Sequence, residues 1–278
     1  MSNDIQLHGE NLQETLSRLQ DRVRNEPANA KHRIFLFQLL AILGDWNRAL
    51  NQLNVLKEMS PETIPMVVTY REAIRCEMLR AEIFAGQRSP VVFGEPESWT
   101  ALLLESLRLT ADENYSQAEE LRAQAFEAAP AIAGIINGHS FDWIADADCR
   151  LGPIIEVIVD GRYVWVPFHR VRRIDIEEPA DLRDSVWMPA HFIWSNGGEL
   201  VGLIPTRYPG TETSEDDQLK LSRKTAWIEA GVDTFLGQGQ KMFTTDAEEY
   251  GIMDIRQVDL ETAADSDGAG SDMDSSHA

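Results

Sequence analysis

Four prolines recur along the first half of the chain at nearly constant intervals. Pro27, Pro61, Pro96 and Pro130 are separated by 34, 35 and 34 residues. A period near 34 is that of the tetratricopeptide (TPR) repeat, in which each unit is a pair of antiparallel helices. Because proline lacks the N–H that would continue a helix, each proline is expected to close one unit. The spacing predicts stacked helical hairpins, which commonly form a groove for another protein's peptide.

Two segments match the second helix of such a unit. In the first, Gly44 precedes Trp46 and Ala49, and in the second Tyr115 and Ala118 repeat the spacing of the last two. Glycine tolerates a positive φ and often ends a helix. We expect Trp46 to be buried between helices and Ala49 to let a neighbouring helix approach closely. An ordinary helical bundle without repeat ancestry stays open as the alternative.

The third unit is irregular. Its first helix is predicted from about residue 66 to residue 85. Residues 89–96 contain two prolines, so a partner helix cannot form there.

The pattern changes near residue 135, from helical periodicity to short β-branched and aromatic runs. Asp160-Gly161 separates the runs 154–159 and 162–166, which is a strong hairpin signal. Residues 196–198 separate two more runs in the same way. The full set of predicted strands is 154–159, 162–166, 171–177, 187–194, 199–205, 226–229, 241–245 and 252–258. Ser214 is expected to begin a short helix that ends near Arg223.

These patterns predict an α+β fold in three parts. Residues 1–135 form TPR-like helical hairpins, residues 136–260 form a mostly antiparallel β-rich domain, and residues 261–278 form an acidic disordered tail. In the β-rich part, Trp187, Phe192 and Trp194 are interpreted as core residues, with a ligand-facing cluster as the alternative.

The chain is strongly acidic, with 46 acidic and 25 basic residues and a net charge of −21. The three parts contribute −6, −10 and −5, so none is net basic. We therefore expect no nucleic-acid partner, because binding of nucleic acid depends on neutralising phosphates.

The longest apolar run, residues 34–43, is too short for a membrane span. With only Cys76 and Cys149 and no secretion signal at the start, we expect a cytoplasmic protein.

No catalytic or metal-binding motif is complete. Ser140 follows Gly138-His139 but lacks the closing glycine of a nucleophile elbow, so a turn is favoured. Asp142, Asp146 and Asp148 are clustered, and for Asp146 and Asp148 hydrogen bonding to the backbone or pairing with Arg150 is favoured over a metal site. His139, His169 and His191 have no metal-ligand spacing, and Gly237-x-Gly239 lacks the third glycine of a dinucleotide-binding loop. We predict no catalytic residue, no metal and no cofactor.

Several long and unusual strings resemble those of the ImpE family, also called TagJ or SciE, of type VI secretion accessory proteins. They lie at residues 35–40, 44–46, 70–77, 93–96, 143–148, 163–168, 186–192, 196–199 and 204–210. The resemblance covers about residues 8–260. It implies a cytoplasmic, non-catalytic adaptor that binds the N-terminal helix of the small sheath subunit TssB, in sheath assembly or in recycling by the ATPase ClpV.

A helical groove could hold such an amphipathic peptide. We expect Phe35 and Leu39 on its floor and Arg71 and Arg75 on its rim, although both arginines could instead pair with acids on the same helix.

Arg207 and Tyr208, at a strand end, are further candidates for contact with the partner, with an internal ion pair as the alternative for Arg207. A different class of function stays open: a small-molecule-binding or hydrolytic β domain carried on a helical oligomerisation module.

Overall fold

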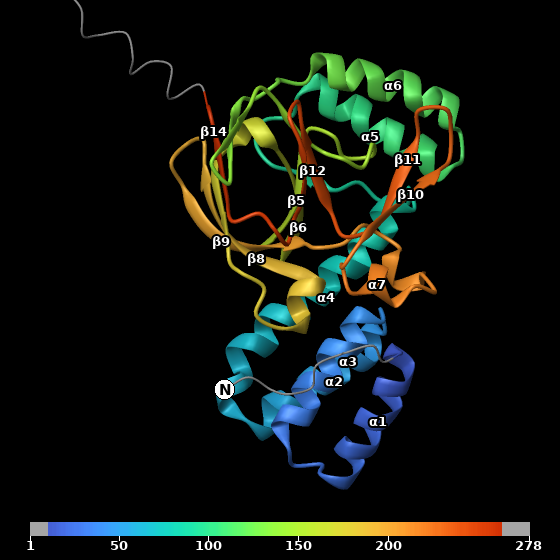
Figure 1. Ribbon diagram of the computed structural model, residues 1–278, viewed down its shortest axis with the longest axis vertical. Coiled ribbons are helices and arrows are strands. Elements are labelled where there is room, and N and C mark those ends of the chain that lie inside the picture. The colour runs from blue at the N-terminus through green and yellow to red at the C-terminus, as the bar shows by residue number, and fades with distance from the viewer. Residues whose placement is uncertain (1–10, 263–278) are drawn as a thin grey trace, which may run out of the picture.

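The structure, a computed structural model, describes residues 11–262 (Figure 1). Six α-helices precede residue 130: α1 (Leu12–Asn25), α2 (Ala30–Ile42), α3 (Trp46–Met59), α4 (Ile64–Phe84), α5 (Ser98–Ala111) and α6 (Tyr115–Ala128). A seventh, α7 (Asp217–Lys220), is short, and four 3-10 turns are η1 (Pro61–Thr63), η2 (Phe168–Arg170), η3 (Leu182–Ser185) and η4 (Thr211–Thr213). All but the first two residues of the predicted disordered tail lie outside the described residues.

The predicted positions of the second helix in each of the two matched hairpins are confirmed. α3 and α6 each contain 14 residues and begin at the matched aromatic positions. Gly44 has a φ of +70° before α3, and the chain leaves the helix at Ser60, just before Pro61. Ala49 and Ala118 are fully buried, as expected for close helix contacts.

Two details of the repeat prediction are wrong. Trp46 is only half-buried, and its ring packs 6.1 Å from that of Trp187 in the β-rich part rather than between repeat helices. The matched hairpins α2–α3 and α5–α6 also do not stack. They lie at opposite ends of the long helix α4, as Figure 1 shows. Residues 89–96 form no helix, as predicted, and contribute strand β1 instead.

The β-rich part is built around a nine-stranded sheet with the order β1-β6-β5-β9-β8-β7-β14-β2-β3. Its strands are β1 (Val91–Val92), β2 (Gly134–Ile136), β3 (His139–Phe141), β5 (Ile154–Val159), β6 (Arg162–Pro167), β7 (Val171–Ile176), β8 (Trp187–Trp194), β9 (Glu199–Pro205) and β14 (Gln257–Leu260). Only the β1–β6 pair is parallel among these neighbours. The predicted α+β class with a mostly antiparallel sheet is therefore confirmed.

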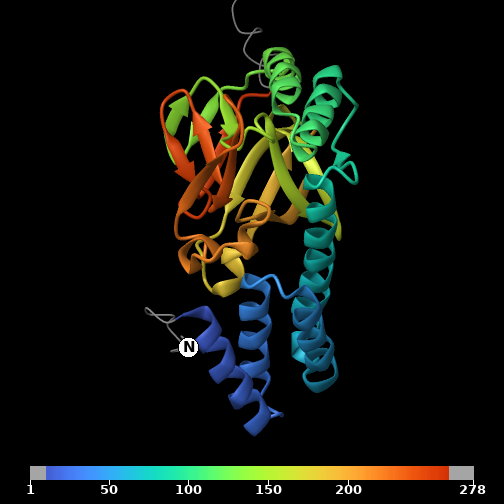
Figure 2. The same ribbon diagram turned by 90° about the vertical axis from the view of Figure 1, so that its right-hand side faces the viewer.

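Two smaller sheets lie beside the large one. One has the order β13-β12-β4, from β4 (Ile144–Asp146), β12 (Met242–Thr245) and β13 (Glu249–Gly251). The other pairs β10 (Thr225–Glu229) with β11 (Phe235–Gly239). In Figure 2 the long helix α4 and these later strands lie on opposite sides of the large sheet.

The predicted hairpins are confirmed, and the errors are local. Asp160 and Gly161 both have positive φ angles, 50° and 70°, as a tight two-residue turn between twisted strands requires. The cap of α7 is Asp216 rather than Ser214. The strand predicted over 252–258 is wrong, because β13 ends at Gly251 and β14 begins only at Gln257.

Two apolar cores lie on the two faces of the large sheet. The first joins α1–α5 to β5, β6, β8 and β9, and includes Ile74, Trp165 and Trp187. The second lies on the opposite face, where the rings of Phe192 and Trp194 stack at 5.2 Å. The core interpretation of these aromatic residues is confirmed.

The first core also crosses the predicted domain boundary near residue 135. The change from helix to strand does fall there, between the end of α6 and the start of β2. The limits 1–135 and 136–260 as separate domains stay a prediction. Within residues 11–262, no helix combines the length and the apolar character that a bilayer span requires.

Ala49→Leu should lower the free energy of unfolding by about 1–3 kcal/mol, because extra methylene groups must enter a site where the side chain is already fully buried. Urea unfolding of the intact chain measures the change. Ala123→Leu, at an exposed position of α6, is the matched control and should unfold like the parent. Equal stability of the two variants would show that the α2–α3 contact is loosely packed.

Candidate protein-binding site

A chain of buried charges joins the helical part to the sheet. Arg80 on α4 makes a two-point ion pair with Glu156 on β5, at 2.6 and 2.8 Å. Lys241, just before β12, lies 2.7 Å from the same carboxylate and 2.6 Å from Asp146 on β4. All four side chains are at most 2% exposed. Charges this deep are stable only when each is paired, so these residues fix the relative position of α4, β4 and β5.

Neutral donors complete the network. The Tyr163 hydroxyl donates to Glu156 at 2.5 Å and accepts from the indole N–H of Trp165 at 2.7 Å. Trp187 donates to Glu77 at 3.2 Å, and this second carboxylate lies 3.4 Å from the Arg80 guanidinium. The aromatic residues of β6 and β8 therefore serve both as core and as hydrogen-bond partners.

The pKa directions follow from burial and pairing. Burial alone would raise the pKa of Glu156, but Arg80 and Lys241 together hold it well below its usual range. For Asp146 burial outweighs the attraction of Lys241, so its pKa rises from 3.8 to about 6. Burial also raises the pKa of Glu77, despite Arg80 beside it.

Arg207 and Tyr208 belong to this interior rather than to a surface. The Arg207 guanidinium donates to the carbonyls of Ile42 and Ala41 at 2.7 and 3.0 Å, so it caps the last turn of α2. It is 3% exposed, and Tyr208, whose hydroxyl lies 3.1 Å from Asp146, is fully buried. This burial contradicts their expected role as partner contacts.

Asp148 is also an internal structural residue. It accepts from Arg150 Nε at 2.8 Å and from the Gly237 N–H at 2.8 Å. The interpretation of Asp146 and Asp148 as residues that accept backbone hydrogen bonds is confirmed. Within residues 11–262, no group of three or more His, Cys, Asp or Glu side chains could hold a metal ion.

The remaining catalytic candidates are dispersed. His139 and Ser140 lie exposed on β3, His169 bonds to Glu97 at 2.9 Å, and His191 lies 3.3 Å from Glu199 on β9. The structure brings no two of the three histidines together.

One face of the large sheet, which we call the helix-side face, is covered by helices at β5 and β6 and open beyond β9. Strand register aligns two rows of side chains across it. One row is Val201, His191, Asp175 and Gln257; the other is Glu199, Ile193, Arg173, Asp259 and Ile135. The charged members of these rows are about 40% exposed or more. This face is therefore accessible to a partner.

An apolar groove of about 710 Å³ runs where α4 meets the open part of this face. Val68 on α4, Ile158 on β5 and Val201 and Leu203 on β9 line it. Gly202 is required in its wall, because a Cβ there would lie 2.9 Å from the carbonyl oxygen of Ile158. We call this feature the α4–β9 groove.

Its rim carries charge. Glu72 and Asp160 lie on one part of it and Arg183 on another. Two large apolar side chains of the groove stay unusually exposed, Val68 at 56% and Val201 at 72%. An open apolar floor with a mixed charged rim is typical of a protein-binding surface.

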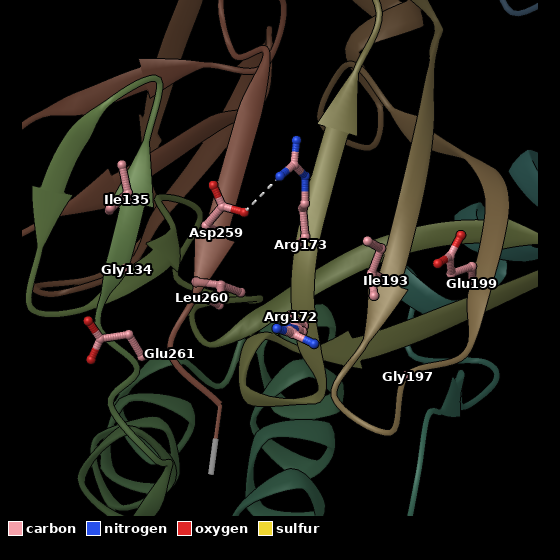
Figure 3. A pocket seen from close by; sticks show the side chains of 10 residues that line it. All are labelled: Gly134, Ile135, Arg172, Arg173, Ile193, Gly197, Glu199, Asp259, Leu260 and Glu261. Carbon is pink, nitrogen blue, oxygen red and sulfur yellow. Dashed lines mark ion pairs between the residues drawn. The ribbon is translucent and has the colours of Figure 1, made fainter. Parts of the chain in front are cut away.

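A second hollow of about 520 Å³ lies farther along the same face (Figure 3). It is lined by Arg173, Ile193, Glu199 and Asp259, and Figure 3 shows the ion pair between Arg173 and Asp259, at 3.5 Å. The α4–β9 groove is thus mainly apolar, whereas this second hollow, near β14, is lined by more charged residues.

The residues expected in a helical groove lie elsewhere. Leu39 is fully buried in the first core, so it cannot be the floor of a groove in this structure. Phe35 is half-buried beside a hollow of only about 10 Å³. Arg71 is half-buried on α4, and Arg75 is exposed and bonds at 2.6 Å to Glu72 on the rim of the α4–β9 groove.

Comparison with known proteins identifies the chain. The family model described as ImpE protein matches residues 138–259. A Pseudomonas aeruginosa protein named type VI secretion system accessory component TagJ is 49% identical over 250 residues, which are 90% of this chain and 88% of that protein. This chain belongs to the ImpE family. The resemblance inferred from the sequence strings is confirmed.

The fold of this ImpE-family protein is also found in a crystal structure. A protein from Vibrio parahaemolyticus superposes with a TM-score of 0.82 and 29% identity, over 90% of this chain and 94% of that one. The strings behind the resemblance supply much of the buried network, including Glu77, Asp146, Tyr163, Trp187 and Arg207.

Glu156→Gln should destabilise the ImpE-family protein by about 3–5 kcal/mol, because Arg80 and Lys241 would stay buried with too little opposing charge. Urea unfolding measures the loss. Glu105→Gln, which removes a surface pair with Arg108, is the control and should be nearly neutral. A neutral Glu156→Gln would mean that water reaches the network.

Asp146 should impose a pH dependence on stability. Its raised pKa means that the folded chain holds this proton more tightly than the unfolded chain does. The stabilisation of the folded chain by this proton is present at acid pH and is lost as the pH rises from about 4 to about 6. Asp146→Asn lacks this loss, so its unfolding free energy relative to the parent should increase over that interval. A difference that stays constant with pH would contradict the assignment.

Proposed function

We propose that this protein is a non-catalytic adaptor of the type VI secretion system whose α4–β9 groove binds the N-terminal helix of the sheath subunit TssB. The observation that carries the proposal is the groove itself, open and apolar, with a mixed charged rim of Glu72, Asp160 and Arg183. The role of its P. aeruginosa relative, named an accessory component of this system, supports the setting.

The open apolar lining of the groove suits an amphipathic helix. A helix with side chains is about 10–12 Å across, and recognition in grooves uses apolar anchors spaced three or four residues apart. Val68 and Val201, which line the groove, are 56% and 72% exposed, so they can meet such anchors. Burying them against a partner removes apolar surface from water, which favours binding.

Charge favours a partner helix with basic residues. Asp160 stands at the rim, Glu72 beside it is already paired with Arg75, and the whole protein carries a net charge of −21. A basic side chain beside the apolar anchors would be attracted to this rim. Rim charges mainly raise the association rate, whereas buried anchors set the dissociation rate.

The sheet-side groove is preferred to one among the hairpins. The hairpins form no continuous concave stack, and Leu39, expected on a groove floor, is internal. The alternative of a hydrolytic or small-molecule-binding β domain has less support, because Asp146, Asp148 and Glu156 are engaged in internal ion pairs. We place the adaptor in the cytoplasm with the sheath, with ClpV as an indirect partner.

Val68→Asp and Val201→Asp should each weaken binding of the synthetic TssB N-terminal helix by at least about tenfold, because a carboxylate would be buried without a partner. Isothermal calorimetry with the full-length protein measures the affinity. Met78→Asp, an exposed position on α4 that does not line the groove, is the matched control. Parent-like binding by both groove variants would overturn the groove assignment, and no binding by the parent would overturn the adaptor function.

A further inference from the structure

The strand β10 presents an open edge on the side of the molecule away from the α4–β9 groove. Within residues 11–262, β10 pairs only with β11. The far edge of β11 is occupied, because Gly237 N donates to Asp148 at 2.8 Å and Gly239 N donates to Thr211 at 2.9 Å. The outer edge of β10 is thus the open side of this hairpin.

Hydrogen bonds at both ends of the hairpin fix which backbone groups face outward. Gln240 N donates to Lys224 O, and Ala230 N donates to Thr234 O, each at 2.9 Å. In an antiparallel pair, facing residues alternate between hydrogen-bonded and non-bonded sites. Positions 224, 226, 228 and 230 therefore bond to β11. The backbone N–H and C=O groups of Thr225, Trp227 and Glu229 point outward.

The hairpin also concentrates exposed apolar side chains. Trp227, Ile228, Val232 and Phe235 are 38%, 50%, 85% and 41% exposed, and all lie within nine residues. Proteins usually protect an edge strand with lysine, proline or a bulge. Strand β10, of sequence Thr-Ala-Trp-Ile-Glu, has neither residue, and its pairing with β11 is regular.

Hydrogen bonds from α6 fix the turn of the β10–β11 hairpin. Arg122 donates to the Asp233 carbonyl at 2.7 Å, and Glu119 accepts from Asp233 N at 2.9 Å and from the Thr234 hydroxyl at 2.8 Å. Because these bonds already order the hairpin, little of its conformational entropy would be lost when a partner binds.

We propose that the open edge of β10 receives an extended segment of a partner protein, which adds as a third strand. Its outward N–H and C=O groups supply main-chain bonds, and Trp227 and Ile228 supply apolar contacts on the two faces. Exposed Glu229 and Asp233 favour lysine or arginine in the added strand. A second copy of this chain is disfavoured as occupant, because each copy carries a net charge of −21.

This surface is distinct from the α4–β9 groove. In Figure 1 the hairpin β10–β11 lies beside α6, whereas β8 and β9 lie across the molecule. The two surfaces could therefore be occupied together, which would let the protein bridge a helix of one partner and a strand of another.

The test is a selection of displayed 12-residue random peptides on the folded full-length protein. We expect enriched peptides that alternate apolar and polar positions and carry Lys or Arg. Glu229→Pro removes one outward N–H without taking a bond from β11, so it should weaken a synthetic copy of the best peptide by at least tenfold. Glu229→Gln separates the loss of charge from the loss of the N–H and should weaken binding less.

Two further variants make the outcome decisive. Ile228→Asp should also weaken the peptide, and it replaces Glu229→Pro if that variant melts below the parent. Val201→Asp, in the α4–β9 groove, should bind the peptide like the parent. Selected peptides without the alternating pattern, or equal binding by Glu229→Pro and Ile228→Asp, would overturn the proposal. A dimer in sedimentation that Ile228→Asp dissociates would show that a second copy occupies the edge, and would overturn it too.

Discussion

The pairing of Arg80 with Glu156, extended through Lys241 to Asp146, is the constraint on which the architecture depends. It joins α4, the neighbouring strands β4 and β5, and Lys241 just before β12, which come from three distant parts of the sequence. Apolar packing alone would let a helix slide on a sheet, since it is not directional. A two-point arginine–carboxylate pair fixes both distance and angle. The position of α4 over the sheet, and with it the α4–β9 groove, follows from this pair.

The network also links the hairpins to the sheet through backbone groups. α2 has no basic residue in its last turn, and Arg207 supplies donors to its final carbonyls from 165 residues away. The Arg80 guanidinium donates in turn to the Arg207 carbonyl at 3.0 Å. The helical and β-rich parts therefore share one apolar core and one hydrogen-bonded network. A protein built in this way holds the α4–β9 groove and the edge of β10 at fixed positions.

Local features were predictable from the sequence, whereas non-local ones were not. The hairpin at Asp160-Gly161 follows from turn chemistry, and α3 and α6 follow from repeat spacing. The insertion of β14 between β7 and β2 depends on packing, which local patterns do not encode. Leu39 was wrongly assigned to a groove floor, because the floor of a groove and a buried core both require apolar residues at the same helical spacing. The nearly unbroken apolar run of α2 was the signal for a buried helix. For Glu156, a lone charge within Ile-Ile-Glu-Val-Ile-Val was a signal of a buried ion pair.

In the proposed function, TssB contacts the sheet side of α4 rather than the hairpins. Site-specific photocrosslinking in cells that contain the native sheath tests it most directly. A benzoylphenylalanine at position 201 should give an adduct with TssB, and one at position 78, exposed on α4 outside the groove, should not. Adducts from position 35 on α2 without any from position 201 would contradict the account.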